Sequence, residues 1–167
     1  MPTAAKKPAA AAKTDVTLLL TRDHNEVHKL FKQYDKLAEA EAEASDRQAL
    51  AEEICMKLTI HATAEEEIFY PAAREAGVES DLLDEAEVEH ASAKDLIAQI
   101  RASTPDEDLY DAKVKVLGEY IDHHVQEEEG ELFPKCRRAK MDLAGLAQQV
   151  AERKDELMAE ASEEVVA

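Results

Sequence analysis

The chain has 167 residues, with 38 acidic and 20 basic side chains, six histidines and a formal net charge of −18. This length fits one domain with its own core. Only four glycines and five prolines occur among many Ala, Glu, Leu and Lys residues, which argues against a β-sandwich, a barrel or a glycine-rich nucleotide fold. The negative charge disfavours nucleic acid and anionic membrane as partners, because both would repel the chain.

Residues 1–14 are rich in Ala, Lys and Pro and are predicted to form a disordered basic tail. They lack the apolar region of a secretory signal, and the chain has no apolar run of about 18 residues that would span a membrane. We therefore expect a cytoplasmic protein in which Cys55 and Cys136 are free thiols, Cys136 lying at the surface beside Arg137 and Arg138.

Apolar residues at steps of three and four predict helices throughout the rest of the chain. A capping box at Ser45 and Gln48 predicts the start of the second helix, and Pro71 predicts its end or a kink. Thr104, followed by a proline, predicts the start of the fourth helix, which should end at Pro134. The five expected helices cover residues 15–44, 45–71, 80 to about 100, 104–134 and 142–163.

Short loops between the first four helices predict an all-α fold, an antiparallel up-down-up-down four-helix bundle with a C-terminal fifth helix. The expected organisation is a tail over 1–14, the bundle over 15–140 and an amphipathic C-terminal helix over 141–167. The fifth helix can pack on the bundle, mediate self-association or fray, and the sequence leaves the oligomeric state open.

Each of the four bundle helices carries one histidine on its apolar face, and two of these histidines are followed by a glutamate one turn later. A spacing of four residues places both side chains on the same helix face. Burying such groups without partners costs about 1–3 kcal/mol each, whereas a bound cation accepts all of them. The six candidate ligands are His24, His61, Glu65, His90, His124 and Glu128.

An internal repeat supports a site with twofold pseudosymmetry. His61 and His124 lie 63 residues apart, and each is followed by an acidic run and, ten residues later, by a proline. The repeat predicts two metal ions, each bound by two histidines and bridged by Glu65 and Glu128. It also pairs His124, rather than His123, with His61, so His123 is predicted to lie at the surface or behind the ligands.

The motifs Asp23-His24, His61-x-x-x-Glu65, Glu89-His90 and His124-x-x-x-Glu128 resemble those of hemerythrin-like proteins with an HHE cation-binding domain, over residues 16–140. The resemblance implies a non-haem di-iron centre, oxo- or hydroxo-bridged, with the six candidate ligands around it. It implies binding of a small ligand (O₂, NO or peroxide) or iron handling. Imidazole and carboxylate donors also suit manganese or zinc.

One position departs from the oxygen-carrying members of that family, which have a second histidine on the third helix. Lys94 stands there, and the repeat makes His28 its counterpart on the first helix. Two interpretations of His28 stay open. It is either a fifth imidazole ligand, which leaves an open position on the other iron, or an exposed residue at the helix edge.

Two further classes of function remain. A di-iron enzyme could decompose hydrogen peroxide or reduce NO, with Tyr34 and Tyr70 near the level of the site. A metal-free helical interaction module would instead use the fifth helix. In the acidic runs 65–67 and 127–129, the residues other than the two proposed ligands are interpreted as a solvated surface.

Overall fold

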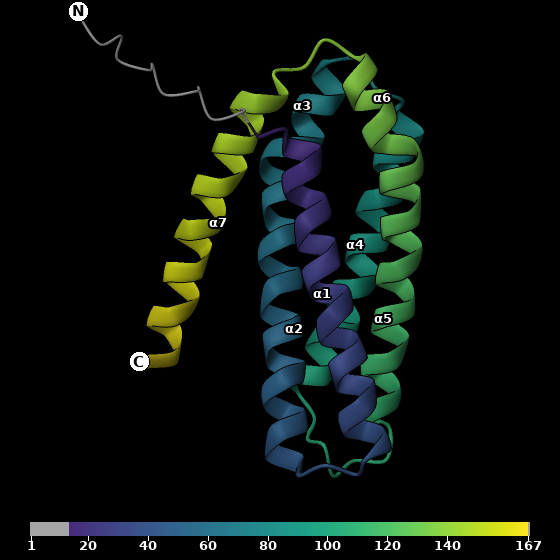
Figure 1. Ribbon diagram of the computed structural model, residues 1–167, viewed down its shortest axis with the longest axis vertical. Helices are drawn as coiled ribbons and strands as arrows, with labels where there is room; N and C mark the ends of the chain where they lie inside the picture. Colours follow the sequence, from purple (N-terminus) through teal and green to yellow (C-terminus); the bar gives the residue numbers. More distant parts are fainter. Residues whose placement is uncertain (1–13, 167) are drawn as a thin grey trace, which may run out of the picture.

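The structure is a computed structural model that describes residues 14–166, so residues 1–13 of the predicted tail lie outside it. Four long helices alternate in direction and form an antiparallel bundle, which confirms the predicted fold class (Figure 1). A fifth long helix follows the bundle. These five are α1 (Val16–Glu39), α2 (Ala44–Ala64), α4 (Ser80–Arg101), α5 (Tyr110–Glu127) and α7 (Leu143–Val166).

The apolar stripes predicted from the sequence form the bundle core, but this core is divided into two clusters along the bundle axis. One cluster lies at the end where α1 begins and includes Leu20, Phe69 and Phe133. The other fills the opposite half and includes Phe31 and Leu117. A layer of buried polar side chains lies between the two clusters. The fold therefore holds a polar layer inside an apolar bundle.

Neither proline ends its helix: Pro134 does not end the fourth helix as predicted, and of the two alternatives predicted for Pro71, an end or a kink, the end is wrong. A π-helical turn, η1 (Glu65–Phe69), continues α2 into the short helix α3 (Tyr70–Glu75), and η2 (Glu128–Leu132) continues α5 into α6 (Phe133–Arg138). A π-helical turn inserts one residue and leaves a carbonyl without its helical donor. A proline, which has no N–H to give, is tolerated directly after such a turn. Both π-helical turns begin at a predicted metal ligand.

Two predicted helix starts are also wrong. Helix α2 begins at Ala44, because the Glu43 carbonyl already accepts the N–H groups of Asp46 and Arg47, so Ser45 lies inside the helix and does not cap it. Helix α5 begins at Tyr110 rather than at Thr104. The Thr104 N–H donates to Oε1 of Glu107 (3.2 Å), but residues 105–109 form turns and a bend rather than a helix. Local capping patterns thus place helix ends only approximately.

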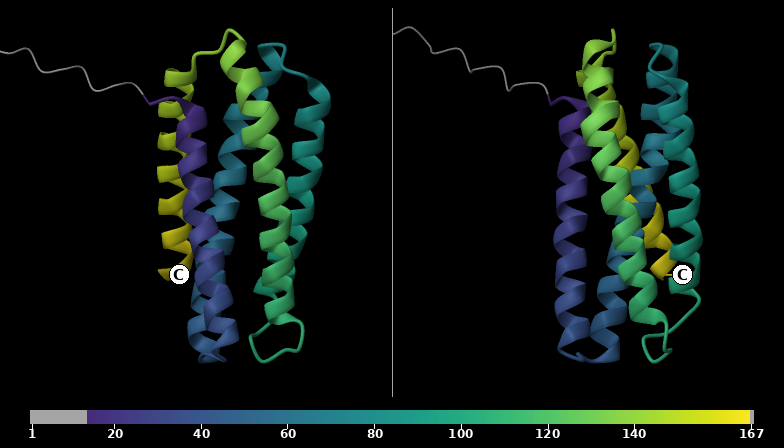
Figure 2. Two further views of the ribbon diagram at one scale, coloured as in Figure 1. Left: turned by 45° about the vertical axis from the view of Figure 1, so that its right-hand side comes forward. Right: turned by 90° about the vertical axis from the view of Figure 1, so that its right-hand side faces the viewer.

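Helix α7 packs along the outside of the bundle, against α1 and α2 (Figures 1 and 2). It buries Leu146, Ala147 and Val150 in the cluster near the start of α1. Of the three alternatives for the fifth helix, the structure therefore shows packing on the bundle. The division of the chain at residue 140 stays a prediction. None of the described helices is both long and apolar enough to cross a lipid bilayer.

Candidate metal centre

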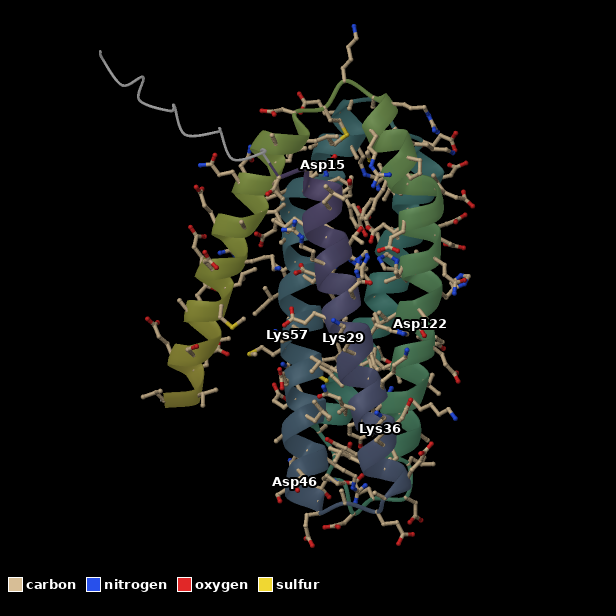
Figure 3. The ribbon with its side chains drawn as sticks, viewed as in Figure 1. Asp15, Lys29, Lys36, Asp46, Lys57 and Asp122 are labelled. Carbon is tan, nitrogen blue, oxygen red and sulfur yellow. The ribbon has the colours of Figure 1, made fainter. Side chains whose placement is uncertain are left out.

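The four predicted histidines come together in the polar layer between the two apolar clusters. Each belongs to a different helix of the bundle, and each is at least nine-tenths buried. Figure 3 shows nitrogen- and oxygen-bearing side chains gathered between α1 and α5, above the labelled Lys29 and Asp122. The four are His24 on α1, His61 on α2, His90 on α4 and His124 on α5.

A carboxylate oxygen faces the Nδ1 atom of every one of these rings. An Nδ1–H that donates to a carboxylate fixes the tautomer and leaves Nε2 with the lone pair that binds a metal. All four Nε2 atoms are thereby turned toward the centre of the bundle. The four pairs are His61 with Asp23 (2.9 Å), His24 with Glu129 (3.0 Å), His90 with Glu66 (2.9 Å) and His124 with Glu89 (2.5 Å).

The Nε2 atoms face one another in two pairs. The Nε2 atoms of His24 and His61 are 3.2 Å apart, and those of His90 and His124 are also 3.2 Å apart. Two lone pairs at this separation repel each other unless a proton or a cation lies beside them. Each pair is therefore suited to hold one positive ion.

Glu65 connects the two pairs. Its Oε1 atom lies 2.7 Å from His61 Nε2, and its Oε2 atom lies 3.1 Å from His90 Nε2. Glu128 Oε2 lies 3.2 Å from His24 Nε2. Both carboxylates are almost fully buried, yet Glu65 Oε1 and Glu128 Oε2 make no hydrogen bond. Buried oxygens of this kind are satisfied by a cation.

The ligating atoms form two groups, in each of which all atoms lie within 4.8 Å of one another. The two groups share Glu65. Nitrogen and oxygen donors without thiolate suit iron, manganese or zinc, and neither cysteine belongs to these groups. The residues present therefore fit a pair of adjacent metal ions. The groups are His24, His61, Glu65 and Glu128, and Glu65, His90 and His124.

The electrostatics show how strongly the layer attracts positive charge. Burial alone would lower the pKa of His61, but the carboxylates of Glu65 and Asp23 raise it to about 10. The pKa of His124 is raised to about 9, because Glu128 and Glu89 outweigh the effect of burial. At neutral pH these rings hold protons when no metal is bound, and a metal ion must displace the protons to bind.

Tyr70 places its hydroxyl at the centre of the cluster and breaks the twofold pseudosymmetry. The hydroxyl lies 3.0 Å from Glu65 Oε2, 2.9 Å from Glu128 Oε1 and 3.2 Å from His90 Nε2. The repeat places Phe133 at the corresponding position, where its ring stacks on His24 at 6.0 Å. One half of the site thus has a phenol, whereas the other half has only an apolar ring.

Two lysines support the carboxylates that hold the rings. Lys154 Nζ on α7 lies 2.5 and 2.6 Å from the two oxygens of Asp23. Lys94 Nζ on α4 lies 2.8 and 2.6 Å from the two oxygens of Glu66. The C-terminal helix therefore reaches His61 through one carboxylate.

Glu66 and Glu129 were not predicted as part of the site, since both were interpreted as solvated surface. The structure places each of them on a histidine ring. The internal repeat was the available signal, because the two residues are 63 positions apart, as His61 and His124 are.

The structure does not bring His28 to the cluster. Its ring is half exposed, and its Nδ1 atom lies 3.3 Å from Asp122 Oδ1. His123 is more exposed still and faces Glu127. Tyr34 lies deep in the other half of the bundle, where its hydroxyl donates to Asp111 (2.6 Å). Of the residues predicted near the site, His28 and Tyr34 are therefore apart from it.

An apolar pocket opens beside the cluster, on the side away from Tyr70's helix α3. Its walls come from all four bundle helices and include Val27, Leu58, Ile97 and Ile121. The four histidines line its inner end, and Lys94 lies at its edge. The pocket therefore lies directly against the two histidine pairs.

The two cysteines are free, but the prediction that Cys136 is a surface thiol is wrong, because α6 turns it into the core. Burial raises the pKa of both thiols to about 12. We expect neither Cys55 nor Cys136 to react with a thiol-labelling reagent at pH 8 in the folded protein, and both to react once the chain is unfolded in guanidinium. Mass spectrometry of the labelled protein gives the count, and rapid labelling without denaturant would contradict this burial.

Comparisons with known proteins identify the family and the fold. The sequence model of the Hemerythrin HHE cation binding domain matches residues 15–136. A crystal structure of a hemerythrin HHE cation-binding domain-containing protein from Mycobacterium kansasii has a similar fold, with a TM-score of 0.76, 23% identity and coverage of 92% of this chain and 93% of that one. A DNA nickase from Nostoc sp. is 33% identical over 122 residues, which are 71% of this chain but 32% of that protein. The chain thus spans about a third of the nickase's length.

Proposed function

Because the chain belongs to the Hemerythrin HHE cation-binding domain family, we propose that its histidine and glutamate cluster binds two iron ions. Through them the protein binds a small ligand (O₂, NO or peroxide) or handles iron. One observation carries this proposal: two buried donor groups share Glu65, and oxygens of Glu65 and Glu128 in them make no hydrogen bond. A protein core without a bound cation gains nothing from such an arrangement.

The proposed ligands are the six residues that the structure brings together, without His28. Each histidine pair would hold one iron through its two Nε2 atoms, and the carboxylates of Glu65 and Glu128, which lie between the pairs, would complete the set. The four carboxylates on the Nδ1 atoms hold the rings in the binding tautomer. Bridged oxo or hydroxo iron belongs to this proposal, while manganese and zinc remain the less favoured metals for the same donors.

When bound, the iron pair supplies Lewis acidity and exchangeable electrons to a small ligand. The chain's own residues supply the remainder. The mostly apolar walls of the pocket favour a small uncharged molecule such as a diatomic gas. The Tyr70 hydroxyl donates to the carboxylates of Glu65 and Glu128, and so holds a proton at the Oη atom within the cluster.

That phenol also favours a second candidate function, a di-iron enzyme that decomposes hydrogen peroxide or reduces NO. Disproportionation of peroxide shuttles protons between its oxygens, and reduction of NO takes up protons together with electrons from an external reductant, so both reactions use a hydrogen-bonding group beside the metal. The Tyr70 hydroxyl is such a group, and burial, Glu65 and Glu128 raise its pKa well above its ordinary value, which keeps the phenol protonated. Evolution of O₂ from peroxide would favour the enzyme. A stable, reversible adduct of the ferrous protein with O₂ would favour the carrier or sensor.

The proposal includes a cytoplasmic location, in keeping with two buried thiols that form no disulfide. It assigns no nucleic acid to this chain, because the charge of −18 would repel a polyanion. The activity named for the Nostoc nickase is therefore not part of the function proposed for this chain.

Metal analysis of the aerobically purified protein tests the proposal. We expect about two iron ions per chain and a visible absorption that changes when azide is added, since azide is an anion that coordinates an open ferric position. A protein that purifies without metal, takes up no iron and is unchanged by a chelator would be a helical interaction module instead.

The variant His28→Ala tests the ligand set. Because the structure places His28 at the surface against Asp122, we expect it to keep the iron content and the azide response of the unmodified protein. Loss of one iron, or of the azide response, would restore His28 as a fifth ligand.

A further inference from the structure

Outside the buried centre, the described residues contain a third group with the spacing of a metal site. It consists of Glu89 on α4 and of His123 and Glu127 on α5, and their ligating atoms lie within 4.8 Å of one another. His123 Nε2 lies 3.2 Å from Glu127 Oε1 and 3.7 Å from Glu89 Oε1. We refer to these three residues as the surface triad. All three side chains are partly accessible to solvent, and His123 is about two-thirds exposed.

The surface triad touches the buried centre through one carboxylate. Glu89 Oε1 faces His123, whereas Glu89 Oε2 accepts from Nδ1 of His124, a proposed ligand. The two histidines are neighbours in the chain, and their rings approach Glu89 from the solvent side and from the bundle interior. A cation held by the surface triad would therefore lie next to the carboxylate that orients a buried ligand.

A small pocket lies between two members of the surface triad, Glu89 and Glu127, and the buried centre. Glu89 and Glu127 line its outer part, and His124 and Glu128 line its inner part, with apolar walls from Leu82, Ala86 and Leu132. Glu128 is 2% exposed, and its Oε2 atom makes no hydrogen bond. The pocket thus reaches two residues of the metal centre, His124 and Glu128, and one oxygen of Glu128 lacks a hydrogen-bond partner.

The charges of the lining residues distinguish this small pocket from the apolar pocket on the other side of the cluster. Two carboxylates of the surface triad lie close together, so a divalent cation relieves their mutual repulsion. The apolar pocket has mostly aliphatic walls, such as Val27, Leu58 and Ile97, and its one carboxylate, that of Asp23, is already paired with Lys154 and His61. The two openings therefore suit different molecules, one a metal ion and the other a neutral ligand.

From these observations we propose that the surface triad is a loading site. It captures a divalent metal ion from solvent and passes it to the buried centre through the small pocket that Glu127 and Glu128 line. This inference rests on the proposed function, because it presupposes that the buried centre takes up metal. The surface triad binds the ion weakly, since it provides only three protein ligands and is open to water.

The test measures the rate of metal uptake. The metal-free protein is mixed anaerobically with Fe²⁺, and incorporation is stopped at intervals with a chromogenic chelator that removes free and surface-bound iron. The variants His123→Ala and Glu127→Gln leave Glu89, and hence its bond to His124, in place. We expect each to take up iron about tenfold more slowly than the unmodified protein, and to reach the same final content of two ions per chain.

His28→Ala and Asp122→Asn are the matched controls, because they alter an exposed histidine and its neighbouring carboxylate without a third ligand. Both controls should load at the unmodified rate. Equal uptake rates in the triad variants and the unmodified protein would overturn the loading site, and so would a lower final iron content, which would assign the triad to the centre itself. An unmodified protein that takes up no iron at all would overturn the proposed function as well.

Discussion

Glu65→Gln is expected to empty both metal positions and to bring the iron content of the purified protein from two ions per chain to near zero. Glu65 belongs to both donor groups, and its two oxygens lie 2.7 and 3.1 Å from Nε2 atoms of different histidine pairs. An amide has one acceptor oxygen and an NH₂ group that cannot ligate a metal. The substitution also removes a full negative charge from a site with no exposure to solvent. Metal analysis and the visible spectrum provide the measurement.

Glu67→Gln is the matched control for this substitution, two residues further along the same acidic run. Glu67 is about half exposed and pairs with Arg153 on α7 at 2.7 Å, away from the ligating atoms. We expect this variant to retain both ions. Full iron content in Glu65→Gln would show that the ligand assignment is wrong. Equal losses of iron in both variants would show that the loss follows from removing any negative charge in residues 65–67 and not from removing a ligand.

The sequence was sufficient to predict the bundle, because burial in a helix repeats at a fixed spacing. The stripe through Leu20, His24, Val27 and Phe31 of α1 is buried as the spacing requires. The repeat likewise selected His124 over His123, and the structure places the former inside the bundle and the latter outside. Periodicity thus identifies which residues of a helix face inward.

Periodicity in one helix says little about which partner a side chain meets on another helix. Glu66 and Glu129 are only partly buried, yet each reaches a histidine of a neighbouring helix. The π-helical turns add to this difficulty, since one inserted residue changes the direction of the residues that follow. The Tyr70 hydroxyl points into the cluster after such a turn, and no spacing rule for an α-helix predicts that position.

His28 shows that the internal repeat can also predict a contact that does not form. The repeat made His28 equivalent to Lys94, but the structure gives the two residues different contacts. Lys94 binds the carboxylate of Glu66, which holds His90. His28 faces Asp122 at the surface. The repeat relates positions along the chain, but the side chains at those positions differ in length and charge, so their contacts differ.

Removal of the metal is expected to destabilise the fold strongly, because the unfolded chain has no preformed site. A ligand present at a thousand times its dissociation constant stabilises the folded state by about 4 kcal/mol. For a chain of this size, that corresponds to a fall of roughly 8–16 °C in the thermal midpoint on chelation. Circular dichroism of the iron-loaded and chelator-treated protein measures the shift. Glu65→Gln, which should bind no metal, is expected to show the same midpoint with and without chelator.

The fall in thermal midpoint on chelation should become larger as the pH rises. In the chelated protein, protons take the place of the metal on the histidine rings, and these protons are lost at high pH. The pKa of His61 rises from its ordinary 6.5 to about 10 and that of His124 to about 9, so their contribution is complete below pH 6.5 and is lost as the pH rises toward these values. The pKa of Glu65 is lowered, so its contribution is present above its ordinary 4.5 and is lost as the pH falls further. The metal-free protein should therefore be most stable between about pH 4.5 and 6.5.

Metal binding needs deprotonated rings and strengthens over the alkaline range, so the difference in thermal midpoint between the iron-loaded and the chelated protein should widen from pH 6.5 to pH 9. A difference that stays constant or narrows over this range would contradict competition between protons and metal for the same nitrogen atoms.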